Sequence, residues 1–217
     1  MKAMLLAAGR GERLRPITDT LPKALVEVRG KSLIEHHLGA LANAGVTSVV
    51  VNLGWHGEQI AERLGSGERF GMTVTYSPEG ENILETGGGI VRALPLLGDE
   101  PFLVVNADVF TDMPYDPRPL DDADGHLVLV PKPAYRPYGD FALEDGRVSN
   151  AEDRPYTFSG VAMYRPSMFA NLEAGRFPLA PLLRDTADSG RLTGEVWNGM
   201  WEDVGTPERL AEVNQSR

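Results

Sequence analysis

The sequence predicts an α/β fold in which a Rossmann-like, mixed but mostly parallel sheet carries helices on both faces. Short apolar runs alternate with segments of helical periodicity, the pattern of strands joined by crossover helices. The first apolar run ends abruptly at Gly9, in a loop that holds two glycines and three arginines before Pro16. Such a loop at the end of a parallel strand presents backbone N–H groups and cations to an anion.

The composition indicates one globular domain that spans residues 1–217. The chain is 42% hydrophobic and 24% charged, and its formal charge is -10. Residues 1–31 hold seven basic and three acidic side chains, so this segment carries +4 and the remainder -14. An acidic protein with a basic entrance argues against nucleic-acid and membrane partners and suits a small phosphorylated ligand.

The compartment can also be inferred from the sequence. The chain has no cysteine, which excludes disulfides and a thiol nucleophile and is compatible with a reducing compartment. Only the apolar residues Ala3–Ala8 follow Lys2, a run shorter than the about 7–15 residues of a signal peptide. No run approaches the about 20 apolar residues of a membrane span. We therefore expect a cytoplasmic protein whose first segment is a buried strand.

The first half of the chain has well-marked elements. A helix is expected to begin after Ser32, because Glu35 completes a capping box, and to end at Gly45. Further helices are expected at about 56–64 and after the glycines at 87–89. Strands are predicted at 2–7, 48–53, 73–77, 102–106 and 126–130.

Prolines interrupt the pattern after about residue 110, so the second half should hold shorter elements. Strands 140–143 and 147–149 are expected to form a hairpin around Asp145-Gly146. Another strand is predicted at 157–164, a helix at 179–189 and a strand at 200–204. The last helix should begin at Pro207, since proline is favoured at the first helical position.

The glycine- and arginine-rich loop fits neither standard phosphate-binding template. It lacks the third glycine of the dinucleotide fingerprint, which disfavours a nicotinamide-dependent dehydrogenase, and it lacks the Gly-Lys-Ser/Thr ending of a P-loop. Gly9 and Gly11 permit close backbone approach, and Arg13 and Lys23 can neutralise phosphates. A surface turn with solvated charges is the alternative.

Two aspartates stand at the ends of apolar segments. Asp108 follows the strand 102–106, and Asp203 lies behind Trp201. Ligands of open α/β sheets bind at the carboxyl ends of strands, and Mg²⁺ is held by one or two carboxylates together with phosphate oxygens. Judged by the residues alone, turn-capping aspartates are the stronger alternative.

The segment Leu6–Pro16, followed by Pro22–Leu25, resembles the signature loop of the sugar-1-phosphate nucleotidyltransferases. The resemblance covers nearly the whole chain. It implies the nucleotide-diphospho-sugar transferase fold, with a nucleotide-binding half at about 1–110 and a sugar-binding half at about 111–217. It also implies nucleotidyl transfer from a nucleoside triphosphate to a sugar 1-phosphate, with Mg²⁺ as cofactor.

The same resemblance assigns roles to individual residues. It implies catalytic roles for Arg13, Lys23 and Asp108, and it makes Asp108 and Asp203 the metal ligands, with Ala107 in place of the usual glycine before Asp108. Lys23 would touch the α-phosphate and the sugar phosphate. The expected nucleotide-binding residues are Ala8, Gly9, Gly11, Glu79, Thr86, Gly87, Gly88 and Asn106. Three consecutive glycines at a helix start would let the backbone meet a flat ligand.

The sugar pocket is expected in the second half, where 138–141 and 157–161 resemble sugar-pocket strands of the family. The candidates are Gly139, Asp140, Glu152, Ser159 and Gly160. Many relatives carry a Glu-Lys-Pro lysine that holds the sugar phosphate, whereas this chain has Arg154-Pro155 at that place. Arg154 is either a substitute for that lysine or a solvent-exposed charge.

Among family members, the chain looks closest to short uridylyltransferases of bacterial cell-wall recycling, with which it shares the segments 77–80 and 84–89. That resemblance implies UTP and N-acetylmuramate 1-phosphate as substrates and a monomer or weak homo-oligomer. Guanylyl or thymidylyl transfer to another hexose 1-phosphate is the alternative within the class. A non-catalytic sensor of sugar nucleotides is the alternative from another class.

Overall fold

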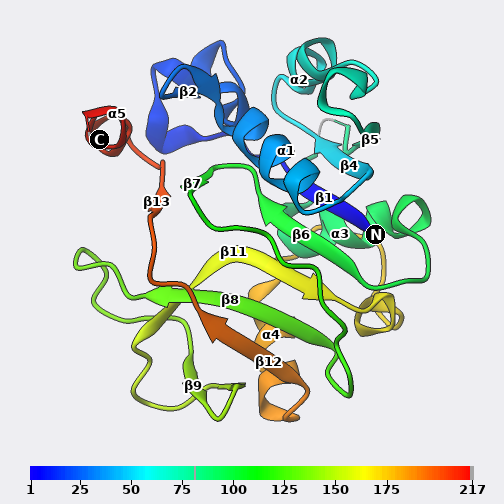
Figure 1. The fold of residues 1–217 in the computed structure, drawn as a ribbon, viewed down its shortest axis with the longest axis vertical. Coiled ribbons are helices and arrows are strands. Elements are labelled where there is room, and N and C mark those ends of the chain that lie inside the picture. The colour runs from blue at the N-terminus through cyan, green and yellow to red at the C-terminus, as the bar shows by residue number, and fades with distance from the viewer. Residues whose placement is uncertain (81, 216–217) are drawn as a thin grey trace.

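The computed structural model of the protein describes residues 1–80 and 82–215 (Figure 1). Within these residues, nine strands form the main sheet in the order β5-β4-β1-β6-β11-β8-β12-β10-β9. Their bounds are β1 Lys2–Leu6, β4 Ser48–Leu53, β5 Thr73–Pro78, β6 Phe102–Asn106, β8 Gly125–Pro131, β9 Ala142–Glu144, β10 Arg147–Ser149, β11 Tyr156–Tyr164 and β12 Leu192–Val196.

The sheet combines a parallel half with an antiparallel extension. β1 lies between β4 and β6, and β5 extends β4, all in parallel register, so their carboxyl ends share one edge. β11 runs antiparallel to both β6 and β8, while β12 is parallel to β8. The predicted mixed sheet is confirmed, and its parallel part coincides with the first half of the chain.

Helices cover both faces of the sheet, as predicted. On one face, α1 (Leu33–Asn43) and α2 (Gly57–Leu64) bury apolar side chains in the same core as alternate residues of β1. On the other face, α3 (Glu85–Leu97) and α4 (Ala180–Asp188) pack against the opposite side of β1 and of β8. This two-sided burial is what a parallel sheet with crossover helices requires.

A smaller third core supports the C-terminal helix α5 (Pro207–Gln215). Two short strand pairs lie beside it: β2 (Glu27–Val28) with β3 (Lys31–Ser32), and β7 (Val109–Thr111) with β13 (Trp201–Asp203). In Figure 1, the segment of β13 runs along the left edge of the molecule and joins β12 to α5. No helix in the described part of the chain is both long and apolar enough to cross a membrane.

One sequence-based expectation about elements needs correction, and one strand of the main sheet was missed. The third helix was expected to follow the glycines at 87–89, but α3 begins at Glu85 and contains all of them. The sequence did not predict β12, which lies beside β8 in the main sheet. The predicted strand 200–204 is confirmed as β13, which pairs with β7 outside the main sheet. The expected hairpin is confirmed as β9 and β10, with Asp145 and Gly146 at positive φ. Other boundaries differ from the predictions by a residue or two.

Candidate functional site

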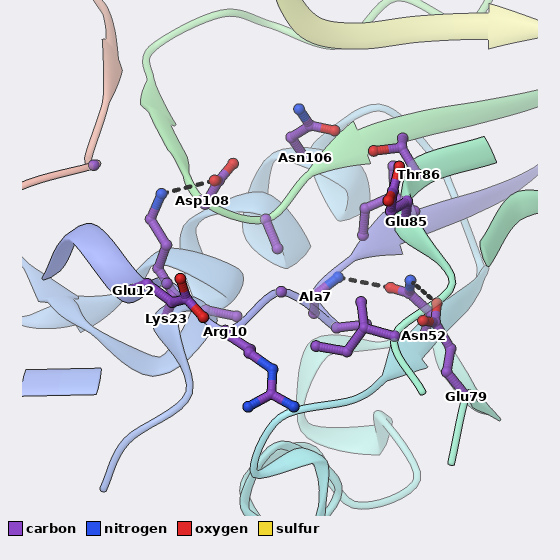
Figure 2. A pocket seen from close by; sticks show the side chains of 18 of the residues that line it. Ala7, Arg10, Glu12, Lys23, Asn52, Glu79, Glu85, Thr86, Asn106 and Asp108 are labelled. Atoms are coloured by element: carbon purple, nitrogen blue, oxygen red, sulfur yellow. Dashed lines mark hydrogen bonds and ion pairs between the residues drawn. The ribbon is translucent and has the colours of Figure 1, made fainter. Parts of the chain in front are cut away.

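A cavity of about 480 Å³ opens at the carboxyl edge of the parallel strands. Its wall consists of the loop after β1, the turn after β6 and the first turn of α3, which come together from distant parts of the chain (Figure 2). Of the sequence-predicted residues, the cavity is lined by Ala8, Gly9, Gly11, Arg13, Lys23, Glu79, Thr86, Asn106 and Asp108.

The loop after β1 owes its shape to Gly11 rather than to Gly9. Gly11 has φ +63°, and a Cβ there would lie 3.0 Å from both Lys23 Cβ and Thr18 Cγ2. The carbonyl of Gly11 also accepts a hydrogen bond from the Thr18 hydroxyl at 2.8 Å. A Cβ on Gly9 would meet nothing within 4 Å, so Gly9 simply leaves space at the cavity wall.

The loop is fastened to the neighbouring segment by a tryptophan. Trp55 Nε1 donates to the carbonyl of Thr18 at 2.9 Å, and the Arg10 guanidinium lies 5.0 Å from the Trp55 ring centroid. This distance is within the range of a cation–π contact. Arg10 is therefore engaged by the ring, whereas Arg13 keeps a side chain that is 65% exposed.

Lys23 lies between the two aspartates that the sequence singled out. Its Nζ is 2.7 Å from Asp108 Oδ2 and 3.6 Å from Asp203 Oδ1, and its side chain is only 10% exposed. The β7–β13 pairing brings the carboxylates together, because Asp203 pairs with Val109, the residue after Asp108. The structure thus places the candidate metal ligands at one point, with Arg13 3.5 Å from Asp203 Oδ2.

The chemistry of these donors fits Mg²⁺. Both candidates are carboxylates, and no group of three or more His, Cys, Asp or Glu side chains that could hold a metal occurs in the described residues. Mg²⁺ takes oxygen ligands and commonly uses one or two carboxylates, completing its shell with substrate phosphates and water. Asp108 and Asp203 could supply the protein's share of such a shell.

Sequence reasoning missed Asn52, which joins two parts of the cavity wall. Its Oδ1 accepts the Ala7 N–H at 2.7 Å, and its Nδ2 donates to Glu79 Oε1 at 2.7 Å (Figure 2). The second oxygen of Glu79 accepts the Leu84 N–H at 2.7 Å. Glu79 therefore already has protein partners on both oxygens. A polar residue inside the apolar run of β4 was the available signal for Asn52.

Gly87 and Gly88 do not line the cavity, although they were expected to bind the nucleotide. Their N–H groups both donate to the carbonyl of Phe177, at 3.1 and 3.2 Å. A Cβ on Gly88 would collide with the carbonyl of Gly175. The absence of side chains at these positions lets α3 pack closely against the chain around 175–177, and Thr86 is the neighbour that reaches the cavity.

The sugar-site candidates lie outside this cavity, but one of them shapes it. Gly160 has φ +84°, and a Cβ there would lie 2.7 Å from Asn106 Nδ2, so glycine makes room for the Asn106 side chain. Ser159 is buried, and its hydroxyl accepts the Val161 N–H at 3.1 Å. A β-bulge between Phe158 and Val161 produces this arrangement.

The remaining candidates cluster before β11. The Gly139 N–H donates to the carbonyl of Arg154 at 3.0 Å, and Asp140 Oδ2 accepts the Phe158 N–H at 2.9 Å. Glu152 is exposed. Arg154 Nε is buried without a hydrogen-bond partner in the described residues, which differs from the fully solvated charge that was one of its two interpretations.

Comparison with known proteins identifies the family. The sequence profile of the nucleotidyl transferase family matches residues 2–217. The chain is 48% identical to N-acetylmuramate alpha-1-phosphate uridylyltransferase of Neisseria meningitidis, over 98% of this chain and 96% of that protein. It is 36% identical to the protein of the same name from Caulobacter vibrioides, over 97% of both chains.

Solved structures agree on the fold. A UDP-glucose pyrophosphorylase complexed with UDP-glucose superposes with a TM-score of 0.77 at 19% identity, covering 98% of this chain and 96% of that one. At that identity the likeness speaks for the fold alone. With the profile match and the two relatives, it leads to one conclusion: the chain belongs to the nucleotidyl transferase family.

Proposed function

We propose that this enzyme transfers the uridylyl group of UTP to N-acetylmuramate 1-phosphate and releases pyrophosphate, with Mg²⁺ as its metal. The convergence of Lys23, Asp108 and Asp203 beside the loop after β1 is the observation that carries the proposal. The printed activity of the Neisseria and Caulobacter relatives supports the choice of substrates, since both align over nearly their whole length.

The proposed reaction is an in-line displacement at phosphorus. An oxygen of the sugar 1-phosphate attacks the α-phosphorus, a new P–O bond forms, and the bond from that phosphorus to the bridging oxygen breaks. Pyrophosphate leaves with the electron pair. The attacking oxygen is already anionic near neutral pH, so no general base is needed. The task of the protein is to hold two anions together and to offset the charge that develops.

Residues of the cavity have matching properties. Arg13 and Lys23 supply positive charge, and the backbone around Gly9 and Gly11 can approach phosphate oxygens closely. Asp108 and Asp203 would hold the metal. Bound Mg²⁺ would neutralise phosphate charge and orient the triphosphate. UTP is a cytoplasmic nucleotide, and the cysteine-free sequence is compatible with that compartment.

The substrate assignment can be tested by a screen for pyrophosphate release. UTP, GTP and dTTP would each be combined with the 1-phosphates of N-acetylmuramate, glucose and mannose. We expect the fastest release from UTP with N-acetylmuramate 1-phosphate. A faster guanylyl or thymidylyl reaction would replace the donor in the proposal. Sugar-nucleotide binding without release from any pair would favour a sensor.

The metal assignment predicts the effect of two substitutions. Asp108→Asn and Asp203→Asn should each lower turnover by at least about 100-fold, because a metal-binding carboxylate contributes several kcal/mol to transition-state stabilisation. Asp116→Asn is the matched control, since that side chain is 70% exposed, pairs with Arg118 and lies outside the cavity. Wild-type turnover in both Asp108→Asn and Asp203→Asn would sink the metal assignment.

A further inference from the structure

Arg209 on α5 holds Asp203 at two points. Its Nη1 lies 3.2 Å from Asp203 Oδ2 and 3.4 Å from the backbone oxygen of the same residue. The side chains of Arg209 and Asp203 are 19% and 13% exposed, whereas Arg13, the other guanidinium near Oδ2, is 65% exposed. Charge-assisted hydrogen bonds that are shielded from water orient a carboxylate far better than an exposed pair does.

An aromatic ring holds Arg209 in turn. The guanidinium carbon is 3.8 Å from the ring centroid of Tyr135, a close cation–π contact. Tyr135 belongs to residues 132–140, which connect β8 to β9 and which we call the tyrosine loop. Tyr135 is 48% exposed, so the loop reaches α5 from the surface of the molecule.

The tyrosine loop also touches the candidate sugar side. At one end, the Lys132 N–H donates to the carbonyl of Pro155 at 2.9 Å. At the other end, Asp140, a sugar-site candidate, accepts the Phe158 N–H at 2.9 Å. Through Tyr135, the loop therefore links the segment before β11 to the cation that holds Asp203.

We propose that Arg209 is a positioning residue: stacked on Tyr135, it commits Asp203 Oδ2 to hydrogen bonding and leaves Oδ1, the oxygen that faces Lys23, for the metal. The inference rests on the proposed function, in which Asp203 is a metal ligand. It adds that the orientation of this ligand depends on the tyrosine loop and hence on a segment of the sugar side.

The sign of one measurement separates this role from simple electrostatics. A positive charge beside Asp203 repels a divalent cation, so a purely electrostatic Arg209 would weaken metal binding, and its removal would tighten it. A positioning Arg209 has the opposite effect, because its removal lets the carboxylate rotate away. Partners that orient metal ligands typically contribute about 10–100-fold to metal affinity or activity.

The first experiment measures Mn²⁺ binding by the EPR signal of free Mn²⁺, in the presence of UTP and without sugar phosphate. A separate assay with both substrates gives kcat and the KM for UTP. In Arg209→Ala we expect Mn²⁺ affinity and kcat to fall about 10-fold or more, with little change in that KM. Arg209→Lys should recover little, because an ammonium lacks the planar guanidinium that stacks on the Tyr135 ring.

Substitutions in the tyrosine loop complete the test. Tyr135→Ala should lower Mn²⁺ affinity, as Arg209→Ala does, whereas Tyr135→Phe should keep the wild-type affinity. The double variant Tyr135→Ala with Arg209→Ala should bind Mn²⁺ as Arg209→Ala alone does. Tyr138→Ala is the matched control for Mn²⁺ affinity measured without sugar phosphate, since Tyr138 is a 73% exposed tyrosine of the same loop. Because Tyr135 is half exposed, its variants keep the test valid even where Arg209→Ala fails to fold.

Two outcomes would overturn the inference. One is unchanged or tighter Mn²⁺ binding in Arg209→Ala with wild-type kcat, and the other is a Tyr135→Ala variant that binds Mn²⁺ as tightly as Tyr138→Ala does. Both are distinguishable from a failure of the proposed function, in which the wild-type protein itself would neither bind Mn²⁺ with UTP nor release pyrophosphate.

Discussion

Glu79 shows how the role of a residue follows from what its polar atoms already contact. The resemblance made it a nucleotide ligand, and it does lie at the cavity wall. Its oxygens, however, accept hydrogen bonds from Asn52 Nδ2 and from the Leu84 N–H, and the residue is 6% exposed. Asn52 in turn accepts the Ala7 N–H. The geometry favours a residue that joins the loop after β1 to the start of α3.

This interpretation predicts that Glu79→Gln lowers the free energy of unfolding. A glutamine amide has one acceptor and one donor group, so in every orientation the NH₂ group faces either Asn52 Nδ2 or the Leu84 N–H. Leaving a buried donor without an acceptor costs about 1–3 kcal/mol. Urea unfolding measures the loss. The exposed Glu152→Gln serves as the control and should leave stability unchanged.

The opposite pattern would contradict it. If Glu79 acts mainly as a nucleotide ligand, Glu79→Gln would raise the KM for UTP and leave the unfolding curve unchanged. Measuring both quantities on the same preparation separates the two roles.

At the scale of elements, local sequence signals predicted α1 but not the start of α3. Ser32 and Glu35 form the expected capping box, because both partners lie within one turn. The first turn of α3 instead satisfies the N–H groups of Gly87 and Gly88 through the carbonyl of Phe177, about ninety residues further along the chain, and Glu85 sits at φ +62°. No short-range pattern contains those contacts, which is why the glycines were expected to precede the helix.

The packing of α3 predicts a contrast between two glycine-to-alanine substitutions. Gly88→Ala should destabilise the protein by about 1–3 kcal/mol or more, because its Cβ would press on the carbonyl of Gly175 and force α3 away. Gly39→Ala, on the exposed side of α1 with nothing within 4 Å of its Cβ, should be neutral or stabilising by up to about 1 kcal/mol.

Thermal unfolding of both variants checks this prediction. Equal midpoints for Gly88→Ala and the wild type would show that the 175–177 segment yields without cost, and the glycines would then need another explanation. The activity of Gly88→Ala should fall as well, since Thr86 on the same turn lines the cavity.

At the scale of the whole molecule, the sequence predicted the sheet and the helices on both faces. It also predicted many of the residues that line the cavity, but it missed Asn52, and Gly87 and Gly88 lie outside the lining. Asp108 and Asp203 could be paired because each stands in a recognisable motif. Arg209 and Tyr135 could not, because α5 and the tyrosine loop meet only through tertiary packing and carry no signature. The sugar half has shorter elements and more turns. Its candidate residues were therefore inferred from the resemblance to the family and not from the periodicity of the sequence.

Acid stability depends on two residues of α1 that tie the first half of the molecule together. Burial raises the pKa of Glu35, but hydrogen bonds from Arg63 and Ser32 outweigh it and lower the pKa from 4.5 to about 2. Arg69 also contacts this carboxylate, at 2.7 Å. Burial lowers the pKa of His37 from 6.5 to about 4, and the ring is hydrogen-bonded to Tyr115 at 2.6 Å.

Both shifts predict that the free energy of unfolding falls on acidification. Each group binds protons more readily in the unfolded chain, so the stabilisation is complete above the unfolded pKa and is lost toward the folded one. His37 should act between about pH 6.5 and 4, and Glu35 between about pH 4.5 and 2. One such group contributes a slope of up to about 1.4 kcal/mol per pH unit within its window.

Urea unfolding between pH 7 and pH 4 tests the His37 contribution. His37→Gln cannot gain a proton, so its curve of stability against pH should be flatter than that of the wild type, whatever its stability at pH 7. Glu35→Gln should keep the wild-type slope above about pH 5 and differ only below it, because the Glu35 window opens near its unfolded pKa of 4.5. A His37→Gln curve parallel to the wild type throughout would mean that His37 is protonated alike in both states, and that burial in α1 does not keep the ring neutral.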